Sequence, residues 1–338
     1  MIYNQSIPRF DAHTHLFHDR DYLTDLLEEW RLKVLVINIT GEDLFERPMD
    51  RRWEAMTAMK ARYPDRVGLC TSFDPSGVTE DGFAERVTEQ LSGHLDAGAA
   101  AVKVWKDIGL DVRDDDGSYV QIDDPRFQPI WDLLAERDVP VIAHTGEPRA
   151  AWQPLDEKSP HYRFYSENPK YHMYRRDDVP DWTEVIAARD RWLEQNPNLT
   201  VVGAHLGSMA HDVEMVSNRL ERYDNFYVDT AERFGDLVTQ PTPTVRDFFK
   251  QHADRILYGT DVIVEHPSDQ VSEDEQAEGK EEYESMLSDH WKYLTSGQPI
   301  VIQDKLVEPV RVSGLDLPPD VLQAVYHDNA ASLYGFAD

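Results

Sequence analysis

The feature that most constrains the fold of this chain is a regular alternation of short apolar runs with amphipathic stretches. The apolar runs are rich in β-branched residues and almost uninterrupted, which is typical of parallel strands buried on both faces. They predict eight strands, at Pro8–His15, Val34–Ile39, Arg66–Phe73, Ala100–Lys106, Val139–His144, Thr200–His205, Asn225–Thr230 and Arg255–Thr260. The amphipathic stretches predict eight helices, at Asp21–Arg31, Leu44–Tyr63, Asp81–Ala97, Arg126–Arg137, Trp182–Asn196, Ala210–Tyr223, Thr244–His252 and Pro319–Tyr334.

Strict alternation of strands and helices indicates an α/β fold, and eight units predict a closed (β/α)8 TIM barrel. An open doubly wound sheet is the main alternative, but such a sheet usually carries a glycine-rich turn after its first strand. Here the first strand ends in His13-Thr14-His15 instead. The 338 residues suit one barrel domain that spans 1–338, because barrels commonly reach this length.

Three long insertions interrupt the alternation, after strands 4, 5 and 8. Leu110–Ile122 has Asp115-Asp116-Gly117 between two alternating arms, which predicts a β-hairpin. Glu147–Asp181 is rich in Tyr, His, Arg and Pro, and Val262–Leu317 includes an acidic run at Ser272–Leu294 that we expect to be helical. Segments that follow barrel strands lie on the catalytic face, so we expect all three insertions there.

The composition excludes several classes of function. The chain has 34 basic and 64 acidic residues, a formal net charge of −30, and such an acidic protein repels nucleic-acid backbones. No apolar run is long enough for a membrane span. Cys70 is the only cysteine and Met1–Arg9 lacks the apolar stretch of a signal peptide, so we expect a cytoplasmic protein. The expected partner is a small-molecule substrate, and the sequence also allows a homodimer.

Five polar residues are placed where a barrel gathers its chemistry. His13 and His15 lie two apart at the end of the first strand, so their side chains point the same way and can share one metal ion. His144, His205 and Asp261 each directly follow an apolar strand run, which places them at the carboxyl-terminal rim. A single histidine there is most often a strand-capping residue, but a set from strands one, five, six and eight favours a metal site. Imidazole and carboxylate ligands suit zinc and other late divalent metals.

Two lysines compete for a functional role in the fourth strand. A buried lysine must be paired, so a lysine inside a barrel without a function is rare. We favour Lys103 as the functional residue. Lys106 is the alternative, because it would point the other way on a regular strand.

The insertion after the fifth strand supplies candidates for substrate binding. It leaves the strand directly after His144, so we expect Glu147–Asp181 to close over the metal. Its arginines suit an anionic substrate, since a guanidinium forks onto a carboxylate. A packed lid or a subunit contact is the alternative explanation of the same residues. The proposed substrate-binding residues of the chain are Trp105, Arg163, Arg175 and His266.

The order of these residues resembles the amidohydrolase superfamily: a His-x-His pair, a lysine on strand four, histidines on strands five and six, and an aspartate on strand eight. The local sequence is similar to the amidohydrolase 2 branch, which includes non-oxidative decarboxylases of aromatic acids, hydrolases and lactonases. Tyr258-Gly259-Thr260-Asp261 resembles the strand-eight signature of that branch, and the segment from His327 to Gly335 resembles its closing helix. The resemblance runs from Phe10 to Phe336 and covers the insertions least well.

The resemblance implies a role for each residue. His13, His15, His144 and Asp261 would bind one divalent ion per chain, zinc or another transition metal. Asp261 would take a proton from a metal-activated water, and His205 would polarise the substrate or act as general acid or base. In members with two metals His205 is instead a ligand, and a carboxylated lysine at the position of Lys103 bridges the ions. An unmodified Lys103 would hold a substrate carboxylate.

These roles predict a metal-dependent hydrolase that acts on a C–N or C–O bond of a small, anionic carbonyl substrate. The alternative is a metal-dependent non-oxidative decarboxylase of an aromatic or unsaturated carboxylic acid, because one barrel hosts many reactions. A binding protein built on a decayed barrel is a third reading, and the complete ligand set argues against it.

Overall fold

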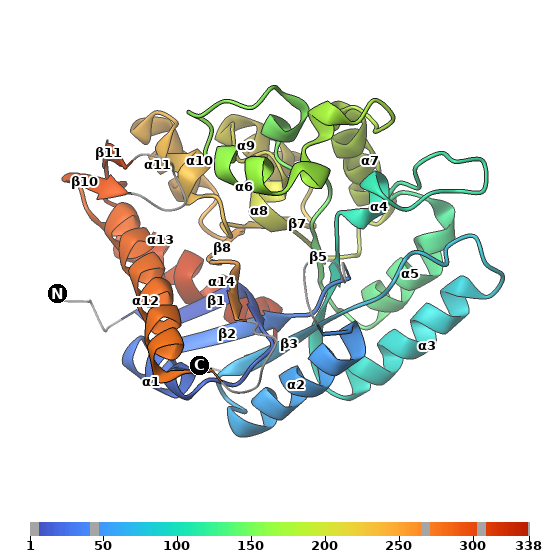
Figure 1. Ribbon diagram of the computed structural model, residues 1–338, viewed down its shortest axis with the longest axis horizontal. Coiled ribbons are helices and arrows are strands. Elements are labelled where there is room, and N and C mark those ends of the chain that lie inside the picture. Colours follow the sequence, from blue (N-terminus) through green and yellow to red (C-terminus); the bar gives the residue numbers. More distant parts are fainter. Residues whose placement is uncertain (1–6, 41–46, 265–270, 303–308, 337–338) are drawn as a thin grey trace.

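The computed structural model describes residues 7–40, 47–264, 271–302 and 309–336. Its main sheet has nine parallel strands in the order β8-β7-β6-β5-β4-β3-β2-β1-β9 (Figure 1). The strands are β1 (Arg9–Leu16), β2 (Leu32–Ile37), β3 (Val67–Ser72), β4 (Ala99–Val104), β5 (Val141–Ala143), β6 (Val201–Gly203), β7 (Phe226–Asp229), β8 (Ile256–Leu257) and β9 (Val262–Val264). All eight predicted strands are present.

The sheet closes on itself through the segment that joins β8 to β9. Strand β8 pairs with β7, and β9 pairs in parallel with β1. Between them, the Ala12 amide donates to the Tyr258 carbonyl and the Asp261 amide donates to the His13 carbonyl, both at 2.8 Å. Strands β8 and β9 are therefore two halves of one barrel strand, which confirms the (β/α)8 fold. The prediction was wrong in one detail, because Val262–Val264 belongs to this strand and not to the insertion after it.

Helices surround the barrel close to the predicted positions. They are α1 (Asp21–Glu29), α2 (Met49–Arg62), α3 (Phe83–Asp96), α5 (Gln128–Glu136), α7 (Trp182–Gln195), α9 (Val213–Arg222), α11 (Thr242–Gln251) and α13 (Pro319–Gln323). The last predicted helix continues from α13 through a π-helical turn, η5 (Ala324–Asp328), into α14 (Asn329–Leu333). One face of each strand packs on these helices and the other fills the barrel interior, and every residue of β1, β3, β5 and β6 is buried.

The insertions contain short elements and one long helix. After β4 come α4 (Asp107–Leu110) and a tight turn in which Arg113 and Tyr119 form an antiparallel bridge, as the hairpin prediction required. The segment after β5 contains four short helices: η2 (Arg149–Trp152), α6 (Tyr162–Glu167), η3 (Pro169–Tyr171) and η4 (Met173–Arg175). After β6 and β7 lie the short helices α8 (Ala204–Gly207) and α10 (Phe234–Val238). The segment after β9 contains α12 (Glu273–Thr295) and the antiparallel pair β10 (Pro299–Ile302) and β11 (Val310–Ser313).

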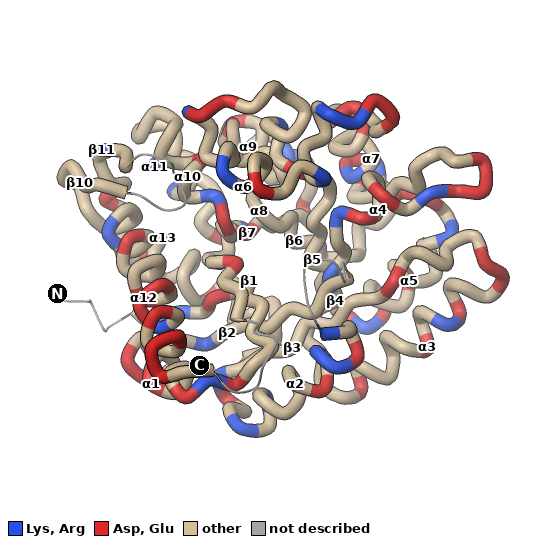
Figure 2. Tube along the Cα trace, viewed as in Figure 1, with Lys and Arg blue, Asp and Glu red and all other residues tan. Residues whose placement is uncertain are grey.

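The acidic charge is concentrated on the outside of the barrel. Helix α12 begins with a capping box formed by Ser272 and Glu275, and acidic residues occur at many positions along it (Figure 2). It packs on α1, where Lys280 lies within 4.0 Å of carboxylate oxygens of both Asp25 and Glu29. Among the described residues, no helix combines the length and apolar character needed to cross a bilayer.

Candidate metal centre

The centre of the site is formed by the two histidines of β1 and the aspartate between β8 and β9. Asp261 Oδ1 lies 3.1 Å from His15 Nε2 and 3.4 Å from His13 Nε2. Each of the three residues offers one ligand atom, and these atoms all lie within 4.8 Å of one another. Three donors this close, from strands that are 248 positions apart in sequence, form a site that one ion can occupy.

Hydrogen bonds on the far side of each ring fix both histidines. His15 Nδ1 donates to the Ile37 carbonyl at 2.8 Å, and His13 Nδ1 lies 2.8 Å from Asp229 Oδ2. Because Nδ1 is the donor in each ring, Nε2 carries the lone pair and lies towards Asp261. This arrangement, in which the second nitrogen orients a metal-binding imidazole, is the usual support of histidine ligands.

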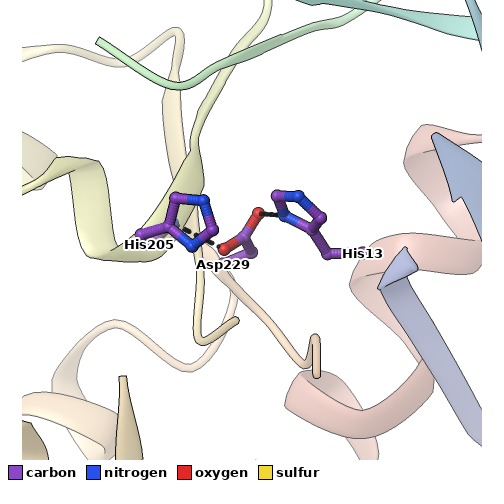
Figure 3. Close-up of side chains that lie close together, drawn as sticks. All are labelled: His13, His205 and Asp229. Atoms are coloured by element: carbon purple, nitrogen blue, oxygen red, sulfur yellow. Dashed lines mark hydrogen bonds and ion pairs between the residues drawn. The ribbon is translucent and has the colours of Figure 1, made fainter. Parts of the chain in front are cut away.

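Asp229, at the end of β7, holds two sides of the site together (Figure 3). Its Oδ2 accepts from His13, while Oδ1 accepts the backbone amides of His205 at 2.7 Å and Ala231 at 3.2 Å. Both oxygens accept hydrogen bonds, which suits a carboxylate that positions the ligands, although ligand atoms of His13, His205 and Asp229 also lie within 4.8 Å of one another. The sequence analysis missed Asp229, although it follows an apolar strand run just as the other rim residues do.

His144 and His205 complete the rim from β5 and β6. Their ring centroids are 4.3 Å apart, and His144 Nε2 is buried with no hydrogen-bond partner among the residues that the structure describes. His205 Nδ1 donates to the Ala231 carbonyl at 2.9 Å, which leaves its Nε2 4.0 Å from Asp261 Oδ2. Burial and nearby cations hold the pKa of both histidines well below the usual value, so both rings are neutral and able to coordinate. The orphaned nitrogen of His144 is what a missing metal bond leaves, and the residues present therefore fit a metal ion.

Asp261 remains an anion inside the barrel. Burial alone would raise its pKa, but His13, His15 and Lys103 together hold it below the ordinary value. Its backbone lies in the left-handed region, with a φ of +65°, where β8 gives way to β9. Backbone strain of this kind is tolerated where the surrounding structure enforces it, commonly at functional sites.

Both candidate lysines face the interior of the site. Lys103 Nζ lies 3.0 Å from His13 Nε2, and burial lowers its pKa. Lys106 lies two residues beyond the end of β4, where the alternation of side-chain directions along a strand no longer applies. Its ammonium group pairs with the carboxylate of Glu147. The second oxygen of Glu147 accepts from the Tyr165 hydroxyl at 3.1 Å. Lys103 thus lies among the proposed ligands. Lys106 instead contacts the insertion after β5, residues 147–181, which we call the lid.

A cavity of about 530 Å³ opens above these groups. Trp105 and Arg163, two of the expected substrate-binding residues, line it. Arg175 is exposed and is not among the lining residues, so the structure does not bring it to the site. His266 lies outside the described residues. The sequence analysis missed Arg233, which lines the cavity and whose buried Nε has no hydrogen-bond partner in residues 7–40, 47–264, 271–302 and 309–336.

A barrel with histidines and an aspartate at the carboxyl ends of its strands defines a class of metal-dependent enzymes. The family model described as amidohydrolase matches residues 10–336. The chain belongs to the amidohydrolase family, whose members are metal-dependent enzymes that include hydrolases and decarboxylases. A comparison with curated proteins finds no match.

Solved structures of low sequence identity share the fold. The 2,6-dihydroxybenzoate decarboxylase from Rhizobium superimposes with a TM-score of 0.55 at 16% identity, over 97% of this chain and 99% of the other. The 5-carboxyvanillate decarboxylase from Sphingomonas paucimobilis gives 0.51 at 13% identity, over 98% and 100%. An uncharacterised TIM-barrel protein from Bordetella bronchiseptica gives 0.53 at 17% identity, over 98% and 99%. At these identities the likeness establishes the architecture.

Proposed function

We propose that this chain is a metal-dependent hydrolase that cleaves a C–N or C–O bond at the carbonyl carbon of a small, anionic substrate. The observation that carries the proposal is that the two carboxylate oxygens of Asp261 face different groups. Oδ1 faces the Nε2 atoms of His13 and His15, while Oδ2 faces His205 Nε2 at 4.0 Å. One carboxylate oxygen is thereby available as a ligand and the other as a proton acceptor.

The residues that would hold the ion are His13, His15, His144 and Asp261. The nitrogen-rich donor set favours zinc or another late divalent metal, at one ion per chain. Such an ion supplies Lewis acidity, which polarises a carbonyl group and lowers the pKa of a water molecule towards neutrality.

The protein's own groups perform the proton transfer and the charge stabilisation. Asp261 Oδ2 accepts the proton of the attacking water. Lys103 Nζ lies beside the ligands, where it can donate a hydrogen bond to the oxyanion that forms on the carbonyl carbon. His205 donates through Nδ1 to the Ala231 carbonyl, so its Nε2 carries the lone pair and can accept a proton. Because burial lowers the pKa of Lys103, its amine can also serve in the neutral form.

The cavity walls favour an anionic, flat substrate. Arg163, Arg233 and Lys106 supply cationic groups, and Trp105 and Phe164 supply aromatic faces. The Nε of Arg233 is buried and makes no hydrogen bond within the described part of the chain, so a substrate carboxylate would give this donor a partner.

A decarboxylase of an aromatic carboxylic acid is the second candidate. The observation that favours it is the same combination of cations and aromatic side chains around one cavity, together with the fold shared with two decarboxylases of aromatic acids. In that reaction the same cations would hold the carboxylate that is lost.

The test is a paired assay of the purified protein supplemented with zinc or manganese. Lactones, amides and esters of small carboxylic acids report hydrolysis, and hydroxybenzoates report release of CO₂. Hydrolysis that requires the metal and is lost in Asp261→Asn is the expected result. Metal-dependent release of CO₂ without hydrolysis would overturn the proposal in favour of the decarboxylase.

A further inference from the structure

A second histidine–carboxylate pair lies beside the cavity, and its histidine is one of the residues that line it. His161 directly precedes α6 in the insertion after β5, and Asp236 lies in α10, after β7. His161 Nε2 lies 3.0 Å from Asp236 Oδ1. Both side chains are buried, with exposed fractions of 8% and 5%, and His161 lines the same cavity as the proposed metal ligands. None of the roles described above uses this pair.

The pair fixes which nitrogen of His161 can exchange a proton. Burial would raise the pKa of Asp236, but His161 and Arg233 together lower it below its ordinary value, so the carboxylate is ionised. An ionised carboxylate only accepts hydrogen bonds, so His161 Nε2 must carry a hydrogen. Within the described part of the chain, Nδ1 of His161 makes no hydrogen bond. The atom also keeps some accessible surface, because it is absent from the fully buried atoms that lack a partner. It is therefore the nitrogen that is open to the cavity.

His161 differs from the rim histidines in a way that suits proton transfer. The Nε2 atoms of His13 and His15 are directed at Asp261, and the pKa of His144 and of His205 is held well below the usual value. Those rings are suited to coordination. His161 instead lies apart from the proposed ligands, and Asp236 holds the orientation of its ring, an arrangement that general acid–base histidines use.

We propose that His161 is the general acid of the reaction and donates its Nδ1 proton to the leaving group, with Asp236 as its positioning residue. The role rests on the proposed hydrolysis. Water adds its oxygen to the carbonyl carbon and gives one proton to Asp261. The C–N or C–O bond then breaks, its electron pair stays with the leaving nitrogen or oxygen, and that atom takes the proton of His161. Solvent carries the proton of Asp261 away and returns one to His161, so the cycle is balanced.

The test compares two esters that differ only in the leaving group. The zinc-loaded enzyme is assayed with the 4-nitrophenyl and the ethyl monoesters of isophthalic acid, which are small, anionic and aromatic. Ethoxide needs a proton as it leaves, whereas 4-nitrophenolate does not. In His161→Ala, kcat on the ethyl ester should fall by about 10²–10⁴-fold, the usual contribution of a general acid, while kcat on the 4-nitrophenyl ester changes little.

Two further variants separate a chemical role from a structural one. Asp236→Asn should give the same selectivity more weakly and move the alkaline limb of the kcat/KM profile to lower pH. The other charged or titratable groups near the pair are Arg233, His211 and Tyr165, and this variant leaves them unchanged. His172→Ala is the matched control. His172 is a buried lid histidine that bonds the Gln153 carbonyl and does not line the cavity, so both esters should slow equally.

Each outcome decides the proposal. If His161→Ala keeps its zinc and loses much more kcat on the ethyl ester than on the 4-nitrophenyl ester, His161 is the general acid. Equal loss on both esters, as in His172→Ala, overturns it and leaves the proposed hydrolysis intact. A wild-type enzyme that hydrolyses neither ester contradicts the proposed hydrolysis, and the role of His161 fails with it.

Discussion

The strand ends that carry the proposed ligands and the lid above them, residues 147–181, are held in place in different ways. His13, His15 and His205 are each attached to barrel backbone or to a second buried residue through the nitrogen that faces away from the site. The lid contains only helices of three to six residues, and a few side-chain contacts attach it. The barrel itself thus sets the positions of the ligands, whereas a small number of polar contacts sets the shape of the cavity roof.

The largest expected effect is the loss of a rim ligand. His13→Ala should reduce activity to the background rate and bound metal from about one ion per chain to almost none, because the remaining donors cannot form a closed set. The barrel should stay folded, since the side chain lies at the rim and not in the packed core. Elemental analysis and circular dichroism check this, with His252→Ala as a histidine control remote from the site. A variant with full metal content would refute the assignment.

The second prediction separates positioning from coordination. Asp229→Asn should weaken metal affinity by about 10–100-fold, because the carboxylate that fixes His13 is lost while every ligand remains. Competition with a chelator measures the change. Asp236→Asn, a buried carboxylate of the lid contact, should leave metal affinity unchanged. Equal effects of the two substitutions would contradict the distinction between rim and lid.

The third prediction concerns the contact that attaches the start of the lid. Glu147→Ala leaves Lys106 as a buried charge without its partner, which costs about 3–5 kcal/mol. Protease cleavage within residues 147–181 should therefore accelerate much more than global unfolding. Replacing both residues together, as Lys106→Met with Glu147→Leu, should restore most of the protection. If the single variant is cleaved no faster than wild type, the lid has other anchors.

A pH-dependent prediction tests the region under the lid. Burial raises the pKa of Asp107 from 3.8 to about 7, and its carboxyl group bonds Thr40. Because the folded state binds this proton more tightly than the unfolded state, protonated Asp107 adds to the free energy of unfolding. This contribution is fully present below pH 3.8 and is lost as the pH rises through 7. The shift corresponds to a loss on the order of 4 kcal/mol. Asp107→Asn should therefore lower the pH dependence of denaturant unfolding between pH 4 and pH 8, unlike the exposed control Asp65→Asn.

The smallest effects are expected at the lid arginines. Arg163 forms an exposed pair with Glu167 and lines the cavity, so Arg163→Ala should change stability by less than about 1 kcal/mol but raise KM for an anionic substrate. Arg175→Ala should change neither quantity, because Arg175 is exposed and away from the cavity. A higher KM in Arg175→Ala would show that the lid closes further when substrate binds.

The same division between strand ends and lid explains what the sequence could predict. Short apolar runs predicted the eight barrel strands but not β9, β10 or β11, and a polar residue directly after such a run predicted the positions that converge at the rim. Contacts within the lid follow no periodicity, so composition was a poor guide there. Arg176 belongs to the arginines that suited an anionic substrate by composition. Its guanidinium instead donates hydrogen bonds to the Asp111 carboxylate, the Leu110 carbonyl and the Tyr119 hydroxyl. His161 and Asp236 are 75 positions apart, and only the fold shows that they meet.

The interruption of the last barrel strand at Asp261 gives the ion a part in folding. Two residues of β8 pair with β7 and three of β9 pair with β1, and the pairing of this barrel strand is interrupted between them at Asp261. An ion bound by Asp261 and the β1 histidines would fasten β1 to the end of the barrel strand beside it. Its binding free energy then adds to the free energy of barrel closure, and ion removal and opening of this joint become one coupled equilibrium. In the metal-free protein, amide hydrogens of Val262–Val264 should exchange with solvent before those of β2 to β6, so that the exchange rate of this short segment reports occupancy of the site.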